Sequence, residues 1–290
     1  MFSGAMTALV TPFSGGSIDE ESFRRHINWQ IEEGIDGIVP CGTTGESATL
    51  SHEEHRRVID IAIDEAKGRV PVIAGTGSNN TAEAVDLTQY AKNAGADGAL
   101  IITPYYNKPT LEGLYAHYKR IAAEASMPIV VYNVPSRTAV NLVPSVVAEL
   151  AKIPEVVGIK EASGDLGQVS QIVELCGEDF DVISGDDATV LPLISVGGKG
   201  VISVVSNVAP ADMKSLCASA NAGDMLKAKA LHFKLAPLAR AMFLEVNPVP
   251  VKMALGMMGR LEFSVRMPLC PLTEASESEL KGELKRYGLI

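Results

Sequence analysis

Eight short runs of apolar residues recur along the chain, each rich in Val and Ile and without regular polar alternation. The runs cover residues 5–10, 37–42, 70–75, 98–103, 128–133, 156–161, 181–185 and 200–205. Strands of a parallel sheet that are buried on both faces have this pattern. We therefore predict eight parallel strands.

The stretches between most of these runs have the pattern of amphipathic helices. Ser51–Ala66 begins with a serine and has a glutamate three residues later, which is typical of a capping box. Residues 81–94 and 111–125 are similar. A glycine follows the predicted helices in EEGIDGIV, NAGADGAL and VGGKGVIS, and glycine suits the left-handed residue that ends a helix.

Strands that alternate with helices predict an α/β fold, and eight of them predict a (β/α)8 TIM barrel. A doubly wound open sheet is the alternative, but no G-x-G-x-x-G segment follows the first strand. Residues after about 207 have helical patterns and no clear strand. We therefore predict a barrel over residues 1–224 and additional C-terminal helices over 225–290 that pack on it.

Composition and charge limit which partners the protein can bind and where in the cell it is expected. The chain has 290 residues, with 25 Lys and Arg against 35 Asp and Glu, and a net charge of −10 argues against binding nucleic acid or an anionic membrane. The four cysteines are far apart, so they indicate reduced thiols rather than a zinc ribbon or a disulfide framework. Neither a signal peptide nor a membrane span is indicated, and we expect a cytoplasmic protein.

Polar residues gather where the predicted strands end, which is the face of a barrel that carries the chemistry. They include CGTTGES, TPYYNKP, YNVPSRT, KEAS and SGDD after strands two, four, five, six and seven. No cluster of His and carboxylate ligands is among them, so no metal is expected, and the pair His52 and His55 is more typical of a helix surface or interface. A phosphate site at Gly75–Gly77 is not favoured, because such sites usually follow strands seven and eight.

Lys160 ends the apolar run VVGIKE. A buried ammonium group costs free energy unless it is paired or loses its proton. A neutral lysine attacks ketones and forms a Schiff base, for which no cofactor is required. Tyr132, one strand over, could move protons during this step. The structural alternative for Lys160 is an ion pair with Glu161 or Asp165. For Tyr132 it is a core tyrosine with no catalytic role.

Two further features could bind carboxylates. The backbone N–H groups and two hydroxyls of GTTGE suit one carboxylate, and the planar guanidinium of Arg137 suits another. The structural alternative for GTTGE is a turn that starts a helix, and for Arg137 it is a solvated arginine in a loop. Asp186 and Asp187 are interpreted as helix N-caps, and Cys41 as a packed thiol.

Six segments together resemble the dihydrodipicolinate synthase family in their order and spacing, and the resemblance extends through NPVPVK at 247–252. The segments are GTTGESATL, AGTGSNNTAEA, TPYYNKP, YNVPSRT, VVGIKEASG and SGDDA. The family belongs to the pyruvate-dependent Schiff-base aldolases, which include N-acetylneuraminate lyase. The resemblance implies a (β/α)8 barrel with C-terminal helices, a homotetramer built as a dimer of dimers, and no cofactor.

The implied reaction condenses pyruvate with L-aspartate 4-semialdehyde to give 4-hydroxy-tetrahydrodipicolinate, in diaminopimelate and lysine biosynthesis. By the same resemblance, Lys160 forms the pyruvate imine and Tyr132 is the general acid and base. Thr43 would link Tyr132 to Tyr106, which resembles a tyrosine donated by a neighbouring subunit. The implied substrate-binding residues are Thr43 and Thr44 for the pyruvate carboxylate, Arg137 for the semialdehyde carboxylate, and the backbone at Gly185 and Ile202.

A second constellation resembles the dimer-interface pocket at which L-lysine inhibits some family members. The matching positions are Ser47, Ala48, His52, His55, Asn79, Glu83 and Tyr105. A glutamate suits the ammonium of the ligand, and polar groups suit its carboxylate. The resemblance therefore implies feedback inhibition by L-lysine.

Two other functions remain as alternatives. Another pyruvate aldolase, such as an N-acetylneuraminate or sugar-acid lyase, would share the lysine and the tyrosine but should lack an arginine like Arg137. A barrel that binds lysine or pyruvate without catalysis would not need the full set of Lys160, Tyr132, Thr43 and Tyr106.

Overall fold

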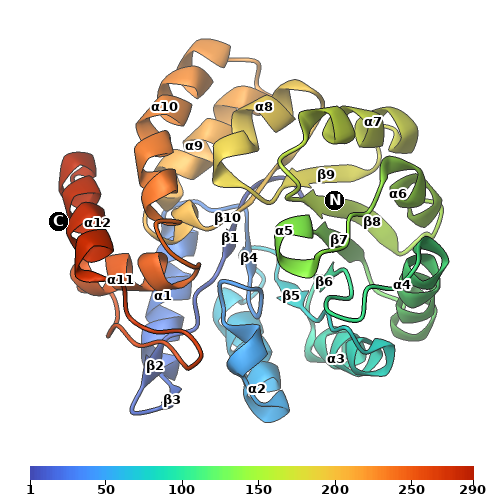
Figure 1. Ribbon diagram of the computed structural model, residues 1–290, viewed down its shortest axis with the longest axis horizontal. Coiled ribbons are helices and arrows are strands. Elements are labelled where there is room, and N and C mark those ends of the chain that lie inside the picture. Colours follow the sequence, from blue (N-terminus) through green and yellow to red (C-terminus); the bar gives the residue numbers. More distant parts are fainter.

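Eight parallel strands form a barrel at the centre of the molecule, with helices around it (Figure 1). The computed structural model describes residues 1–290. The barrel strands are β1 Gly4–Ala8, β4 Gly37–Val39, β5 Ile73–Gly75, β6 Gly98–Ile102, β7 Ile129–Asn133, β8 Val156–Glu161, β9 Asp181–Ser184 and β10 Gly200–Ser203. They pair in the order β4-β1-β10-β9-β8-β7-β6-β5, and a parallel bridge between Ile38 and Val72 joins the two ends. The predicted (β/α)8 TIM barrel is confirmed.

Helices follow most of the strands and cover the barrel from outside. They are α1 Glu20–Glu32, α2 His52–Ala66, α3 Thr81–Ala94, α4 Leu111–Ala125, α5 Pro135–Thr138, α6 Pro144–Leu150, α7 Leu166–Cys176, α8 Val190–Ser195 and α9 Pro210–Asn221. The predicted capping box of α2 is present, because Ser51 Oγ accepts from the Glu54 N–H and the Glu54 carboxylate accepts from the Ser51 N–H.

Three C-terminal helices lie against one side of the barrel, where Figure 1 draws them in orange to red. They are α10 Met225–Ala241, α11 Val249–Met257 and α12 Glu274–Tyr287. No strand follows β10, as predicted. Leu235, Leu255 and Leu284 are buried in the same hydrophobic cluster as Phe23 and Val58, so the C-terminal helices share a core with the barrel.

The glycines that were expected to end helices do so. Gly34, Gly95 and Gly197 have φ angles of +87°, +101° and +106° and follow α1, α3 and α8, a conformation that costs glycine nothing. The sequence did not predict the hairpin of β2 Phe13–Ser14 and β3 Ser17–Ile18. Two-residue strands are too short to show a period.

Three short 3₁₀ turns, η1 Ser47–Thr49, η2 Asp187–Thr189 and η3 Val205–Asn207, lie in the segments that follow β4, β9 and β10. Several predicted strands are shorter in the structure. The first strand ends at Ala8, whereas its apolar run continues through Val10. Leu9 and Val10 are buried but lie beyond the last residue paired in the sheet. No helix of the molecule is long and apolar enough to cross a membrane.

Candidate active site

The sheet register brings Lys160 and Tyr132 together. Lys160 on β8 pairs with Tyr132 on β7, and the Lys160 Nζ lies 4.3 Å from the centre of the Tyr132 ring. Lys160 is 6% exposed, and burial lowers the pKa of its amine from 10.5 to about 8, although Asp187 opposes this shift. About a tenth of the amine is therefore neutral at pH 7, far more than for an exposed lysine with a pKa of about 10.4.

Gly185 allows the chain after β9 to pass close to Lys160. A Cβ at this position would lie 2.6 Å from the Ala162 Cβ and 3.1 Å from the Lys160 Cε, so a side chain would clash with Ala162 and crowd the lysine stem. The Gly185 N–H donates to the backbone oxygen of Glu161 at 2.8 Å. The turn that begins at Gly185 is thus fixed against β8.

Tyr132 is buried beside the GTTGE turn, residues 42–46. Burial raises the pKa of its phenol, Arg137 and a hydrogen bond with the Thr43 side chain lower it, and the net shift is upward. The phenol is therefore protonated at neutral pH, and Tyr132 and Thr43 line the same cavities. This pair could pass a proton between Tyr132 and the loop.

The GTTGE turn has free backbone donors, among them those of its two threonines. The N–H groups of Gly45 and Glu46 donate within the turn, to Gly42 and Thr43, whereas those of Thr43 and Thr44 make no hydrogen bond within the chain. The Thr44 hydroxyl is buried and accepts from the Asn247 Nδ2 at 3.0 Å. Free N–H groups beside hydroxyls suit a small carboxylate.

Two adjoining cavities surround these residues. The Lys160 cavity, of about 540 Å³, is lined by Thr43, Thr44, Tyr132, Arg137, Lys160 and Gly185 among others. The second, which we call the His55 cavity, has about 550 Å³ and shares Thr43, Tyr132 and Arg137 with the first. The Ile202 side chain is packed inside the barrel and lines neither; the sequence prediction concerned its backbone.

Tyr106 does not meet the other predicted catalytic residues within one chain. Its side chain is 90% exposed, its φ is +70°, and it lines neither cavity. Left-handed backbone is uncommon for a residue other than glycine. The loop that carries Tyr106 therefore holds the ring out from its own barrel.

Most of the predicted lysine-site residues share the His55 cavity. It is lined by Ser47, Ala48, His52, His55, Glu83 and Tyr105. Asn79 is not among the lining residues, and its amide donates to the Tyr105 backbone oxygen at 3.2 Å. His52 Nε2 lies 3.1 Å from the Glu83 carboxylate. His55 is buried with its Nε2 2.7 Å from the Gly75 oxygen, and burial lowers its pKa.

The two aspartates after β9 have different roles. Asp186 accepts from the Ala188 N–H at 2.9 Å, so its interpretation as an N-cap is confirmed. The same interpretation is wrong for Asp187, which is buried and accepts instead from residues at the end of β10. Cys41 is a buried thiol whose pKa is raised by burial, in agreement with a packed thiol.

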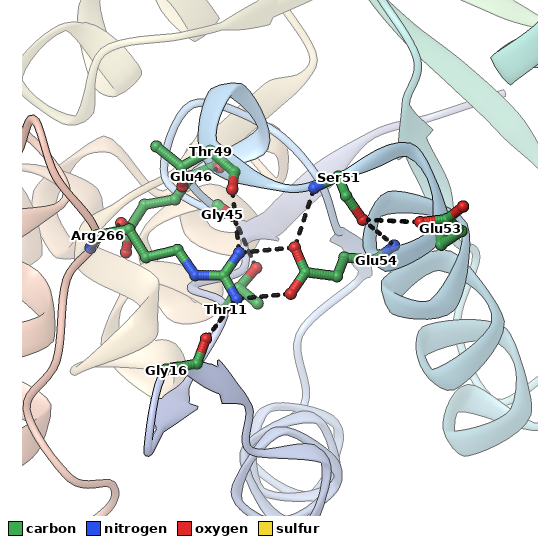
Figure 2. A network of polar contacts seen from close by, with 9 residues as sticks. All are labelled: Thr11, Gly16, Gly45, Glu46, Thr49, Ser51, Glu53, Glu54 and Arg266. Carbon is green, nitrogen blue, oxygen red and sulfur yellow. Dashed lines mark hydrogen bonds and ion pairs between the residues drawn. The ribbon is translucent and has the colours of Figure 1, made fainter.

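Residues of the C-terminal region bind the GTTGE turn through Glu46. The Glu46 carboxylate accepts from the Lys252 Nζ at 2.5 Å and from the Arg266 N–H at 3.0 Å. Figure 2 shows the Arg266 guanidinium between the turn, the start of α2 and the β2–β3 hairpin. It donates to both Glu54 oxygens, at 2.6 and 2.7 Å, and to the backbone oxygens of Thr49 and Gly16.

Sequence reasoning did not single out Asn247 or Lys252, although both fall in NPVPVK. Asn247 lines both cavities. Lys252 is fully buried, and burial lowers its pKa. The only signal available in the sequence was a lysine in an apolar helix, which does not reveal a partner 206 positions away.

The chain is similar to known proteins along its whole length. A model of the "Dihydrodipicolinate synthetase family" matches residues 1–287. The 4-hydroxy-tetrahydrodipicolinate synthase of Oleidesulfovibrio alaskensis is 64% identical over 290 residues, which are 100% of this chain and 99% of that protein.

Two solved structures are similar in fold as well as in sequence. The chloride-inhibited dihydrodipicolinate synthase from Acinetobacter baumannii, complexed with pyruvate, has a TM-score of 0.98 and 46% identity and covers 100% of both chains. The enzyme from Cyanidioschyzon merolae with lysine bound has a TM-score of 0.97 and 37% identity, covering 100% of this chain and 99% of that one.

Proposed function

This chain belongs to the dihydrodipicolinate synthetase family, and we propose that its reaction depends on the amine of Lys160. The enzyme is a Schiff-base-forming lyase that condenses pyruvate with L-aspartate 4-semialdehyde to give 4-hydroxy-tetrahydrodipicolinate, in the route to diaminopimelate and lysine. The observation that carries the assignment to Lys160 is its buried amine 4.3 Å from the Tyr132 ring centre, with a pKa of about 8.

The first step is attack of the neutral Lys160 amine on the carbonyl carbon of pyruvate. The carbonyl oxygen must take up protons and leave as water, and the Tyr132 phenol is the group placed to supply and recover them. The product is a protonated imine. Its positive charge withdraws electrons from the methyl carbon, so that loss of a methyl proton gives an enamine.

The enamine carbon then bonds to the aldehyde carbon of the second substrate, and the aldehyde oxygen takes a proton to become a hydroxyl. The amino group of that substrate attacks the imine carbon, releases the Lys160 amine and closes the ring. Tyr132 and Thr43 form the part of the proton path that lies within one chain.

The substrate carboxylates have separate partners in this proposal. The free N–H groups of Thr43 and Thr44 suit the pyruvate carboxylate. Arg137 lines both cavities and suits the semialdehyde carboxylate, because its guanidinium can donate two parallel hydrogen bonds. The backbone at Gly185 and Ile202 would complete the pocket wall.

We also propose that Tyr106 enters the site of a neighbouring subunit and completes the proton path through Thr43, in a homotetramer built as a dimer of dimers. What supports this is its exposed ring, held away from its own barrel by left-handed backbone. Four unpaired cysteines support a cytoplasmic location.

Feedback inhibition by L-lysine is proposed for the His55 cavity. Support comes from Glu83, which could pair with a ligand ammonium, and from the family member crystallised with lysine. Isothermal titration with L-lysine tests it. We expect heat of binding and a lower turnover, and the absence of both would refute the regulatory site.

A direct assay tests the catalytic assignment. Pyruvate with L-aspartate 4-semialdehyde should turn over with the native enzyme and not with Lys160→Met, whereas Lys152→Met, which changes an exposed lysine, should retain native rates. Native turnover by Lys160→Met would remove Lys160 from the mechanism. Turnover of N-acetylneuraminate instead would favour a sugar-acid lyase.

A further inference from the structure

The Lys160 cavity contains the buried carboxylate of Asp187, which has no role in the proposed reaction steps. Asp187 is 6% exposed and lines this cavity together with Lys160 and Gly185. The turn from Gly185 to Asp187 passes against the lysine stem, since a Cβ on Gly185 would be 3.1 Å from the Lys160 Cε. Asp187 is therefore carried on the segment that packs on Lys160.

Three neutral donors fix the orientation of this carboxylate. Ser203 Oγ donates to its Oδ1 at 2.5 Å, and the N–H groups of Val204 and Val205 donate to its Oδ2 at 3.0 and 3.1 Å. Burial raises the pKa of this carboxyl and these bonds lower it, but none of them supplies a charge that neutralises the carboxylate. A buried charge without an opposite charge is costly, so the cavity is suited to a cation.

The other charged or titratable groups facing the cavity are Tyr132 from β7, Arg137 from α5, Asp186 beside Asp187, and Arg240 from α10. Asp187 raises the pKa of the Lys160 amine, and Arg137 lowers it. Cys217 of α9 lies near Asp187 on the side of the protein core, and burial raises the pKa of its thiol. Asp187 is thus the carboxylate whose charge favours a cation at the Lys160 nitrogen.

We propose that Asp187 stabilises the positively charged imine that Lys160 forms with pyruvate. The proposal rests on the proposed function of Lys160. Neutral amine, ketone and one proton give the protonated imine and water, so the nitrogen carries a positive charge that the neutral amine lacked. Asp187 acts through Lys160 rather than on the substrate, and is a positioning residue.

Asp187→Asn isolates the charge from the hydrogen bonds. The asparagine oxygen can accept from the Val204 and Val205 N–H groups, and its amide nitrogen can donate to the Ser203 Oγ. Asp186→Asn is the matched control, because Asp186 lies in the same cavity but caps η2 through the Ala188 N–H.

The test traps the imine with pyruvate and cyanoborohydride from about pH 6 to about pH 10, a range that spans the altered amine pKa. In Asp187→Asn we expect the pH midpoint to fall. Above this midpoint, the pyruvate concentration for half-maximal trapping should rise about tenfold for each unit of lost amine pKa. Well below it, where amine and imine are both cationic, the concentration should change little.

An unchanged midpoint and unchanged pyruvate dependence in Asp187→Asn would overturn the proposal while leaving the function of Lys160 intact. No trapping in the native enzyme would overturn both. Thermal unfolding checks the fold, and Asp187→Ser is a second neutral variant to be measured if Asp187→Asn is unstable. Asp186→Asn should match the native midpoint.

Discussion

The position of Lys160 on β8 suits its side chain to nucleophilic attack. The strand buries its side chain beside the Tyr132 ring, and burial penalises the ammonium form. The amine pKa falls from 10.5 to about 8. A nucleophile and a proton donor therefore lie side by side on neighbouring strands.

The pH dependence of imine formation follows from this pKa. Only the neutral amine attacks, so the rate at low pyruvate concentration should rise with pH and level off above about 8. Because the folded pKa is below the unfolded value, burial of Lys160 costs stability below pH 8, and the cost is relieved as pH rises toward 10.5. A rate that continues to rise beyond about pH 10 would indicate an ordinary exposed amine.

Removing the Tyr132 hydroxyl should slow the chemistry while leaving the barrel intact. For Tyr132→Phe we expect turnover to fall about 10²- to 10⁴-fold, the usual contribution of a general acid and base. Tyr118→Phe is the control, since Tyr118 is also buried but donates to the Ile101 backbone oxygen. Equal losses in the two variants would argue for a structural role.

The sequence was informative where the chemistry is local to a strand end. Lys160 and Tyr132 each follow an apolar run, and the strand order places them side by side. Asp187 was misinterpreted because its donors are at 203–205. Asn247 was missed because its partner Thr44 is 203 positions away, and no local pattern reveals such a contact.

At the scale of elements, the shape of the GTTGE turn depends on the C-terminal helices and the loop after α11. Glu46 has a φ of +54°, and its carboxylate is held by Lys252 of α11 and by the Arg266 backbone. The sequence patterns predicted that this region is helical, without the individual helices. Their docking onto the turn was not predictable, because it depends on side chains far apart in the chain.

Removing the buried ion pair of Lys252 and Glu46 should lower the stability of the fold. Lys252→Met leaves Glu46 without its cation, and we expect a loss of about 3–5 kcal/mol in the free energy of unfolding, together with a higher KM for pyruvate. Lys234→Met is the control, because its pair with Asp212 is half exposed and should be worth about 0–1 kcal/mol. Chemical denaturation measures both. Similar losses in the two variants would contradict the role given to Lys252.

At the scale of the whole molecule, the proposed proton path extends beyond one chain. Lys160, Tyr132 and Thr43 lie together, whereas Tyr106 points away from them. The proposal that a second copy supplies Tyr106 makes assembly part of catalysis.

Mixing two impaired variants tests this directly. Tyr106→Phe should lower turnover without dissociating the proposed tetramer, and Lys160→Met should be inactive. A hybrid of the two would contain a site with an intact Lys160 and an intact Tyr106 from its neighbour. We expect co-refolded mixtures to exceed the activity of either variant alone. No gain in demonstrated hybrids would indicate that Tyr106 does not act between subunits.

The central claim is that Lys160 forms the covalent bond with pyruvate, and mass spectrometry after borohydride reduction tests it most directly. We predict one reduced pyruvate adduct per chain, on the peptide that contains Lys160. The absence of an adduct, or an adduct on another lysine such as Lys252, would contradict the account.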